Sequence, residues 1–355
     1  MLLEGKKVLV TGGTGSMGKT LVRRILGGEL GRPARLTVMS RDEGKQHDMR
    51  MTYLNRWVAT DEVIYRSFKR ALQFQVGDVR NYADVCAALR DTDIVVNAAA
   101  LKQVPTCEYF PEQAMLTNCA GAVNIVRAIR DHGYPVETVV AISTDKACRP
   151  VNVMGMTKAL QERIFVAANV SCPRTRFVGV RYGNVLASRG SVIPLFHAQI
   201  RSGGPVTVTV PSMTRFLLTL DQAVDTVFAA LAGARPGEIY VPRAPSATVQ
   251  NIALALIGRR EIEIQVTGIR PGEKMHEIML SDEEAPRCAV RGDWYAIAPM
   301  LPELAPEPAP GAGVLTKEYS SADEVLDLAD TVALLRRHRL LIEDVPAERV
   351  PELLA

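Results

Sequence analysis

Three glycines near the N-terminus have the spacing of an anion-binding turn. Gly12, Gly15 and Gly18 lie in the run TGGTGSMG, after a β-branched run and before a stretch with helical spacing of apolar residues. Such glycines allow a tight turn and a close approach of the backbone to a pyrophosphate, which the N-terminus of the helix faces. A flexible loop is the alternative, but the flanking strand and helix favour a dinucleotide site that includes Gly12, Thr14, Gly15, Ser16, Met17 and Gly18.

Polar side chains at the end of the second predicted strand indicate which dinucleotide binds. Ser40 and Arg41 stand at the strand tip, and Lys45 follows closely. An NAD site favours a carboxylate there, whereas a 2′-phosphate is better met by an arginine and a hydroxyl. We therefore expect NADP, while the nearby Asp42 keeps NAD as an alternative.

The turn after the third predicted strand offers a further cofactor contact. Gly77, Asp78 and Val79 follow the strand end at Val76. An aspartate in this place can accept a hydrogen bond from an adenine amino group, and an ordinary turn aspartate is the competing interpretation. We assign Asp78 and Val79 to the cofactor site.

Short apolar strands alternate with helical stretches through the first half of the chain. Because the strands lack strict polar alternation, we expect a parallel sheet covered on both faces, which is a doubly wound, Rossmann-like α/β fold. A helix at 220–231 and a strand at 238–241 should return to this sheet. The earlier strands are predicted at Lys7–Thr11, Arg35–Ser40, Phe74–Val76, Ile94–Ala98, Thr138–Ser143 and Val178–Arg181.

The second half of the chain is mixed in character. We expect a dinucleotide-binding domain at 1–185 with returns near 214–243, and a smaller substrate domain from 186–213 and 244–300. Residues 301–355 should form a proline-rich linker, LPELAPEPAP, and one short C-terminal helix near Asp323–Arg337.

Composition excludes several classes of protein. Hydrophobic residues make up 47% and charged residues 23% of the 355 residues, and the net charge is +3 without a long basic run. A nucleic-acid partner and a membrane partner are therefore not expected. The six cysteines lack zinc-binding spacing and no stretch is apolar enough to span a bilayer, so we expect no metal and a cytoplasmic protein.

Several motifs resemble those of a known family. TGGTGSMG, the NAAA run at Asn97–Ala100, Lys158 and the run RYGNV from Arg181 resemble the extended short-chain dehydrogenase/reductases. Within that family, AALKQVP, STDKA, RYGNV followed by SRGSVIP, and RPGEKMHE are similar to the UDP-N-acetylglucosamine 4,6-dehydratases of surface-glycan pathways, over about residues 5 to 300. The resemblance implies further cofactor contacts at Ala98, Ala99, Ala100, Lys158 and Tyr182.

The chemistry of such a dehydration requires an acid beside a base. Oxidation of the sugar at C4 makes the C5 proton acidic, so that a base can remove it while an acid protonates the leaving C6 hydroxyl. The resemblance implies that Thr144 bonds the sugar O4, that Asp145 is the acid and that Lys146 is the base. Lys146 must then be neutral, and we expect burial, Lys158 and an oxidised nicotinamide to lower its pKa. Family members with this STDK arrangement mostly invert the configuration at C5, so the resemblance implies the same inversion here.

One position departs from the superfamily pattern. A tyrosine normally stands four residues before the active-site lysine, on the same helix face, but Met154 occupies that place before Lys158. A thioether cannot accept the O4 proton. The chain could be an inactive NADP sensor, a dehydratase that moves this proton through Thr144, Asp145, Lys146 or water, or an enzyme with another outcome such as a 5,6-dehydratase or epimerase. A family subset resembles this chain in having Met there, so we favour the dehydratase.

The nucleotide half of the substrate needs fixed cationic donors. The resemblance places Asn184, Arg215 and Arg270 on the UDP diphosphate and Glu273 on the uridine ribose. Lys102 is expected to touch substrate or cofactor. Cys107 is more simply a buried inert thiol than a redox group. UDP-N-acetylglucosamine is the expected substrate, and the resemblance implies a homo-oligomer such as a hexamer.

Overall fold

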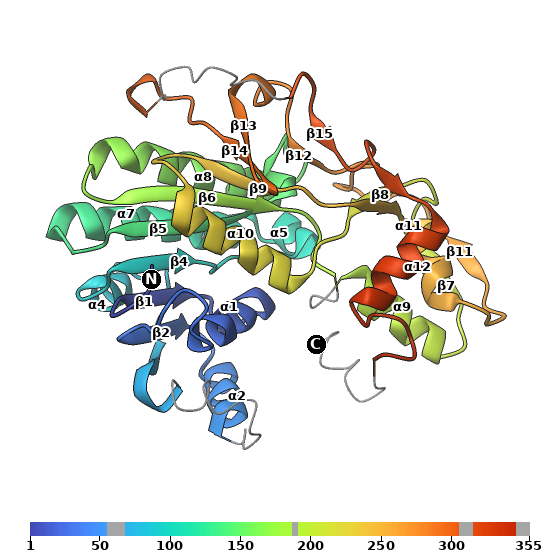
Figure 1. Ribbon diagram of the computed structural model, residues 1–355, viewed down its shortest axis with the longest axis horizontal. Helices are drawn as coiled ribbons and strands as arrows, with labels where there is room; N and C mark the ends of the chain where they lie inside the picture. The colour runs from blue at the N-terminus through green and yellow to red at the C-terminus, as the bar shows by residue number, and fades with distance from the viewer. Residues whose placement is uncertain (55–67, 187–190, 305–314, 346–355) are drawn as a thin grey trace.

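A nine-stranded sheet forms the centre of the computed structural model, which describes residues 1–54, 68–186, 191–304 and 315–345 (Figure 1). Seven strands are parallel, and β14 and β13 extend one edge in antiparallel fashion. The order across the sheet is β13 (Cys288–Arg291), β14 (Trp294–Ile297), β9 (Ile239–Pro242), β6 (Arg176–Tyr182), β5 (Thr138–Thr144), β4 (Ile94–Asn97), β1 (Lys7–Thr11), β2 (Arg35–Ser40) and β3 (Leu72–Val76).

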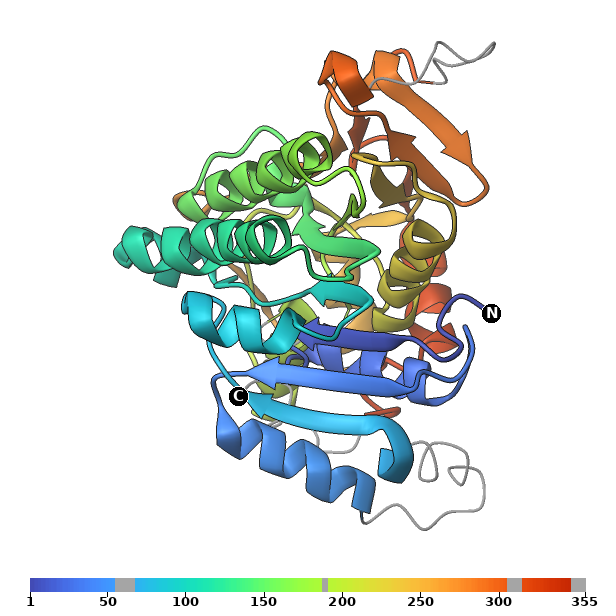
Figure 2. The same ribbon diagram turned by 90° about the vertical axis from the view of Figure 1, so that its left-hand side faces the viewer.

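Helices cover both faces of this sheet, as the doubly wound pattern predicted. Val8 and Val10 of β1 join the core cluster beneath one helix layer, and Leu9 joins the cluster beneath the other. In Figure 2, α7 and α8 lie on one side of the strands and α10 on the other. The first layer contains α1 (Ser16–Leu26), α2 (Glu43–Leu54) and α10 (Leu220–Gly233), and the second contains α4 (Tyr82–Leu89), α7 (Gly121–His132) and α8 (Val153–Ser171).

The strand order reverses at β1, which lies between β2 and β4. The chain moves from β1 outward through β2 and β3, then crosses back to β4, β5 and β6. Loops that leave β1 and β4 at their carboxyl ends therefore diverge, and a crevice opens where ligands bind in sheets of this kind. The segment after β4 contains α5 (Val104–Tyr109), α6 (Pro111–Ala114) and the π-helical stretch η2 (Met115–Ala120).

A smaller lobe, on the right in Figure 1, has its own apolar core. Its helices are α9 (Val192–Arg201), α11 (Val249–Ile257) and α12 (Leu328–Arg337). Two small sheets lie with these helices: β7 (Val206–Val208) with β11 (Ile264–Val266), and β10 (Ser246–Thr248) between β8 (Thr214–Phe216) and β16 (Val325–Leu326). A further pair, β12 (Ile278–Leu280) with β15 (Tyr319–Ser320), shares a core cluster with β9, β13 and β14 at the edge of the central sheet.

The chain is divided differently from the predicted boundaries at two places. Strands β13 and β14 join the central sheet, although residues 244–300 were assigned to the substrate domain, because their backbone groups pair with the free edge of β9. Conversely, β8 pairs with β10 in the small lobe, although residues 214–243 were predicted to return to the dinucleotide-binding domain.

Part of the predicted linker, 305–310, lies outside the described residues, as do residues 187–190 of the SRGSVIP motif. No described helix is long and apolar enough to cross a membrane.

Candidate active site

A cavity of about 640 Å³ opens at the carboxyl ends of the parallel strands. It brings together residues from the glycine turn, the tips of β2 to β5, helix α8 and the segment after β6. All the predicted cofactor residues and five further predicted catalytic or substrate positions, at 102, 144, 145, 146 and 184, contribute to its wall. The cavity wall includes Gly12, Thr14, Gly15, Ser16, Met17, Gly18, Ser40, Arg41, Lys45, Asp78, Val79, Ala98, Ala99, Ala100, Lys102, Thr144, Asp145, Lys146, Met154, Lys158, Tyr182 and Asn184.

The glycine turn leaves backbone donors open toward this cavity. Gly12 has a φ of +66°, and a Cβ there would lie 2.7 Å from the Ala98 carbonyl oxygen. Gly15 is the N-cap of α1 and provides no side-chain cap, while a Cβ on it would meet nothing closer than 3.5 Å. The first turn of α1 therefore faces an open space lined by N–H groups, and this arrangement fits a dinucleotide pyrophosphate.

The tip of β2 is rich in positive charge. Arg41 is exposed and its Nη1 lies 3.8 Å from Asp78 Oδ2. Lys45 pairs with Asp42 at 2.9 Å, and this lysine lowers the pKa of the Asp42 carboxyl. Ser40 Oγ accepts a hydrogen bond from Thr14 Oγ at 3.2 Å. Because Asp42 is already engaged, the groups best placed to meet a ribose substituent are a hydroxyl and two cations.

Strand β5 ends in the predicted acid–base group. A short 3₁₀ turn, η3 (Asp145–Ala147), follows Thr144. Thr144 Oγ donates to Asp145 Oδ1 at 2.7 Å, and the Lys146 Nζ lies 3.1 Å from the same oxygen. Lys146 Nζ also lies 3.3 Å from Asn184 Oδ1 and 3.2 Å from Glu277 Oε1. The lysine is therefore surrounded by three oxygen acceptors.

The charge state of Lys146 differs from our expectation. Burial lowers the pKa of Lys146, but the charges of Asp145 and Glu277 raise it by more, so the pKa lies above its ordinary value. The predicted lowering was wrong for the chain on its own, because sequence gave no sign of the second carboxylate. We expected Lys158 to be the cation that opposes the charged form of Lys146, but Arg215 takes that place.

Lys158 is the lysine whose pKa is lowered. Its Nζ donates to the Ile142 carbonyl oxygen at 2.5 Å and to Gln161 Oε1. Burial lowers the pKa of Lys158 to about 8, against a smaller opposing effect of Glu162. Near neutral pH this buried lysine remains mostly charged, and a modest rise in pH makes it neutral.

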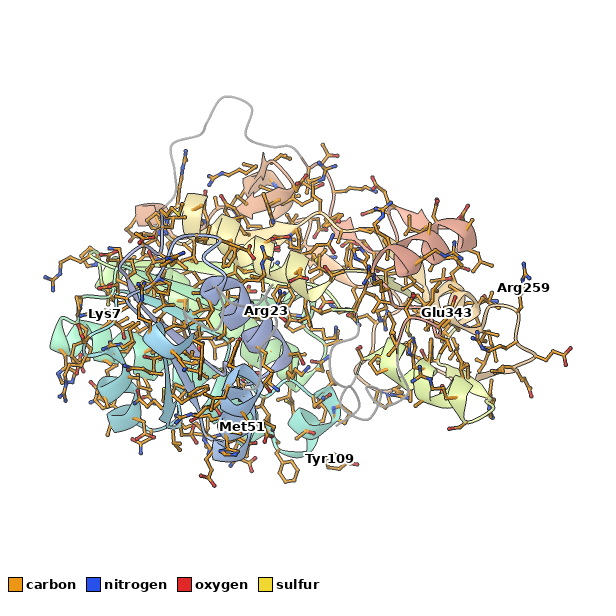
Figure 3. The ribbon with its side chains drawn as sticks, turned by 60° about the horizontal axis from the view of Figure 1, so that its bottom comes forward. Lys7, Arg23, Met51, Tyr109, Arg259 and Glu343 are labelled. Atoms are coloured by element: carbon orange, nitrogen blue, oxygen red, sulfur yellow. The ribbon has the colours of Figure 1, made fainter. Side chains whose placement is uncertain are left out.

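Met154 packs into an apolar cluster beside the cavity. It is 5% exposed and joins a core cluster with Cys107 and Ala114. Cys107 is fully buried in α5, and burial raises the pKa of its thiol. Tyr109 of the same helix projects from the edge of the molecule (Figure 3). Met154 therefore has a packing role, and Cys107 has the surroundings of an inert thiol.

Tyr182 does not replace the missing tyrosine. It lines the cavity, but burial raises the pKa of its phenol well above the ordinary value. A phenol that acts as a base needs a lowered pKa, which a neighbouring cation would provide. Tyr182 therefore stays protonated and is not placed to act as a base.

Three predicted substrate residues lie elsewhere than in the cavity wall. Among the described residues, Arg215, Arg270 and Glu273 are absent from that wall. Arg215 is buried, and its guanidinium donates to the carbonyl oxygens of its neighbour Thr214 and of Met275. Arg270 is exposed in a turn, where its backbone N–H donates to the Glu273 carboxylate at 3.4 Å. A role for Arg215 in holding a diphosphate is not supported by these internal contacts.

Sequence reasoning missed two buried polar residues near the site. Glu277 ends the RPGEKMHE motif, but nothing in its spacing indicated a partner 3.2 Å away on the loop after β5. Asn118, fully buried in η2, donates to the Thr157 hydroxyl of α8 and to the Leu101 carbonyl oxygen, and so fixes the loop after β4.

A buried ion-pair network supports the end of β6. Arg181 Nη2 donates to Glu162 Oε2 of α8 at 2.7 Å, and its Nη1 donates to Glu284 Oε2 at 2.8 Å. All three residues are at most 10% exposed. Because Arg181 is paired with Ser143 in the sheet register, this network fixes the strand ends directly before Thr144.

Comparisons with known proteins agree with this architecture. The sequence profile of a family described as "Polysaccharide biosynthesis protein" matches residues 8–299. Proteins named UDP-glucose 4-epimerase from Rickettsia bellii (strain OSU 85-389) and Rickettsia akari (strain Hartford) are 42% and 41% identical over 298 and 297 residues, which is 82% of each chain.

Two solved structures show the same fold. The X-ray structure of Pen from Bacillus thuringiensis has a TM-score of 0.84 at 32% identity and covers 96% of this chain and 100% of its own. DesIV, a dTDP-glucose 4,6-dehydratase from Streptomyces venezuelae with NAD and DAU bound, has a TM-score of 0.63 at 22% identity and covers 76% of this chain and 86% of its own. At that identity the likeness to DesIV concerns the fold alone.

Proposed function

The chain belongs to the polysaccharide biosynthesis protein family of extended short-chain dehydrogenase/reductases that modify sugar nucleotides, and on this premise we propose that it is an NADP-dependent 4,6-dehydratase of UDP-N-acetylglucosamine. The product would be a UDP-4-keto-6-deoxy-N-acetylhexosamine with inverted configuration at C5. One observation carries the proposal: an aspartate and a lysine stand side by side in the cavity wall at the end of β5, with a hydroxyl before them.

Such a pair is what separates a dehydratase from a 4-epimerase. An epimerase needs only one group that takes and returns the O4 proton. A dehydratase also needs a base for the C5 proton and an acid for the C6 oxygen. Asp145 and Lys146 supply two groups beyond Thr144, and both line the cavity.

The proton that a tyrosine usually accepts has another path here. Thr144 already donates its hydroxyl proton to Asp145 at 2.7 Å. When the sugar O4 gives its proton to Thr144 Oγ, the hydroxyl proton of Thr144 can pass to Asp145. The protonated Asp145 can then act as the acid that protonates the leaving C6 hydroxyl. The O4 proton thus leaves with the water, and Met154 takes no part.

A nicotinamide dinucleotide, when bound, supplies the reversible two-electron oxidation at C4 that the sequence of steps requires. The open N-terminus of α1 would hold its pyrophosphate, and Ser40, Arg41 and Lys45 would meet a 2′-phosphate. Lys158, buried beneath the cavity, would hold a ribose hydroxyl. Solved neighbours with NAD bound support a nicotinamide dinucleotide in this fold.

Epimerisation of a UDP-sugar at C4 is the second candidate, because the relatives at 41–42% identity are named UDP-glucose 4-epimerase. Mass spectrometry of the nucleotide products separates the two. Purified protein with NADP and UDP-N-acetylglucosamine should give a product lighter by one water. A product of unchanged mass, or turnover of UDP-glucose alone, would favour the epimerase. An inactive protein that binds NADP tightly would favour the sensor.

A further inference from the structure

Glu277 is a buried carboxylate that contacts Lys146 in the short turn after β5. It is 2% exposed, and its Oε1 lies 3.2 Å from Lys146 Nζ and 3.7 Å from Arg215 Nε. Its other oxygen, Oε2, is buried and has no hydrogen-bond partner among the described residues. Burial of a carboxylate oxygen without a hydrogen-bond donor costs free energy, so the position of the Glu277 side chain needs a specific explanation.

The backbone around Glu277 is held rigidly. Glu277 N donates to Ser321 Oγ at 2.9 Å, and Ser321 N donates to the Glu277 carbonyl oxygen at 2.8 Å. Earlier in the same segment, Lys274 Nζ donates to the Cys148 carbonyl oxygen at 2.8 Å. The segment is thus fastened both to the small lobe and to the loop after Lys146, and the carboxylate has little freedom to leave the lysine.

The acceptors around Lys146 are chemically unequal. Lys146 must lose a proton before it can act as a base, and the receiving group must be within hydrogen-bond reach. The Asn184 amide oxygen cannot hold a proton at neutral pH. Asp145 is occupied by the Thr144 hydroxyl and is needed for the O4 proton. Glu277 is the remaining acceptor that the structure describes, and its unpartnered Oε2 leaves room for a neutral carboxyl group.

We propose that Glu277 is the proton-accepting partner of Lys146, an inference that rests on the proposed dehydration. In this step one Lys146 N–H bond breaks and one O–H bond forms on Glu277, so that an ion pair becomes a neutral pair. Lys146 rotates its lone pair from Glu277 toward the cavity and takes the C5 proton. Lys146 then releases the C5 proton to water, and C5 takes a water-derived proton on its opposite face. The carboxyl proton of Glu277 returns to Lys146, so that one proton is lost to water, one is gained from it, and the protein ends unchanged.

The charges around the pair are compatible with this exchange. Lys146 is faced by Asp145 and Glu277, which favour its charged form, and by Arg215, which opposes it. Glu277 is faced by Lys146 and Arg215, while its neighbour His276 is exposed and bonds Thr214 Oγ through Nδ1. A cationic ligand in the cavity would add to the effect of Arg215 and favour the neutral pair.

A purely electrostatic role for Glu277 leads to the opposite result. If the carboxylate only kept Lys146 charged, its removal would release neutral lysine and raise activity at neutral pH. If it receives the proton, Glu277→Gln keeps the shape and a hydrogen bond but cannot accept. We expect kcat to fall by about 10²-fold or more while KM for the UDP-sugar changes by less than about threefold.

The test compares Glu277→Gln with Glu277→Asp and Glu283→Gln, the last being an exposed carboxylate on the same segment. Glu283→Gln should match the wild type. Glu277→Asp keeps a proton acceptor and should retain more activity than the glutamine variant, which also guards against a loss caused by folding. Activity of Glu277→Gln equal to or above that of Glu277→Asp or of the wild type would overturn the inference.

A second readout does not depend on the substrate. The Lys146 pKa can be measured by NMR of the protein with ¹⁵Nζ-labelled lysine, with the signal assigned by its loss in Lys146→Met. In Glu277→Gln this pKa should fall below the wild-type value, and an unchanged pKa would contradict the pairing. This shift tests the contact between the two groups, and the fall in kcat of the same variant tests the proton transfer. A wild-type protein that leaves UDP-N-acetylglucosamine intact while this shift is present would refute the proposed function and leave the proton pair standing.

Discussion

Arg181 Nη1 lies 2.8 Å from Glu284 Oε2, and this buried ion pair joins β6 to the segment that carries Glu277. The guanidinium also binds Glu162 of α8, so it connects three parts of the chain near the end of β5, where Thr144 precedes Asp145 and Lys146. We expect the position of Glu277 against Lys146 to depend on this network, none of whose three side chains lines the cavity.

Breaking this network should destabilise the fold strongly. Glu284→Gln leaves part of the Arg181 charge buried and uncompensated, which costs about 3–5 kcal/mol. Denaturant unfolding measures the loss. The matched control is Asp221→Asn, which breaks the exposed pair with Arg23 and should cost less than about 1 kcal/mol. Equal losses in the two variants would mean that the buried network does not stabilise the strand ends.

Removal of Lys146 should abolish water loss and spare cofactor binding. Lys146→Ala deletes the proposed C5 base, so the rate of dehydration should fall by about 10²–10⁴-fold. Fluorescence titration with NADPH should give a Kd close to that of the wild type, because the proposal assigns Lys146 to the sugar and not to the dinucleotide. A fully active variant would remove Lys146 from the mechanism.

Met154 should be replaceable by another apolar residue of similar volume. Met154→Leu keeps the contact with Cys107 and Ala114 and should cost less than about 1.5 kcal/mol of stability. Activity should stay within about threefold of the wild type, since the account gives the thioether no chemical role. A collapse of kcat comparable to that of Lys146→Ala, in a variant that melts normally, would show a role for the sulfur.

Arg41 should discriminate between the two dinucleotides. The loss of a charge-assisted bond to a 2′-phosphate is worth about 1.5–3 kcal/mol, so Arg41→Ala should weaken NADPH binding by about 10–100-fold. NADH binding should hardly change. Arg50→Ala is the control: Arg50 lies on α2, the helix that follows Arg41, with its guanidinium stacked on Phe74, and this variant should bind both dinucleotides as the wild type does. NADH bound more tightly than NADPH by the wild type would show that the cofactor is NAD.

The lowered pKa of Lys158 should appear as a pH dependence of stability. The pKa of Lys158 is about 8 in the folded protein and 10.5 in its ordinary state, so between pH 8 and pH 10.5 the unfolded chain binds more protons than the folded one. Stability should therefore gain a contribution that rises from about pH 8 to about pH 10.5. Lys158→Met should lack this rise in denaturant unfolding measured across that range. A variant with the same slope as the wild type would contradict the assignment.

Much of the fold and half of the site follow from local sequence. The glycine turn and the seven parallel strands carry short-range signals, and the cavity collects every cofactor residue assigned from them. The edge strands β13 and β14 were not foreseen, because an antiparallel pair at a sheet edge has no distinctive spacing. Glu277 and the raised pKa of Lys146 were also missed, since both arise from contacts between distant segments that periodicity does not record.

The most direct test of the central claim is proton NMR of UDP-N-acetylglucosamine incubated with the purified protein and NADP in deuterated water. The account predicts a 4-keto-6-deoxy sugar that has lost one water, carries deuterium at C5 and shows ring couplings of the inverted configuration. A sugar that keeps its C6 hydroxyl and its C5 proton and differs only in configuration at C4 would contradict the account and identify an epimerase.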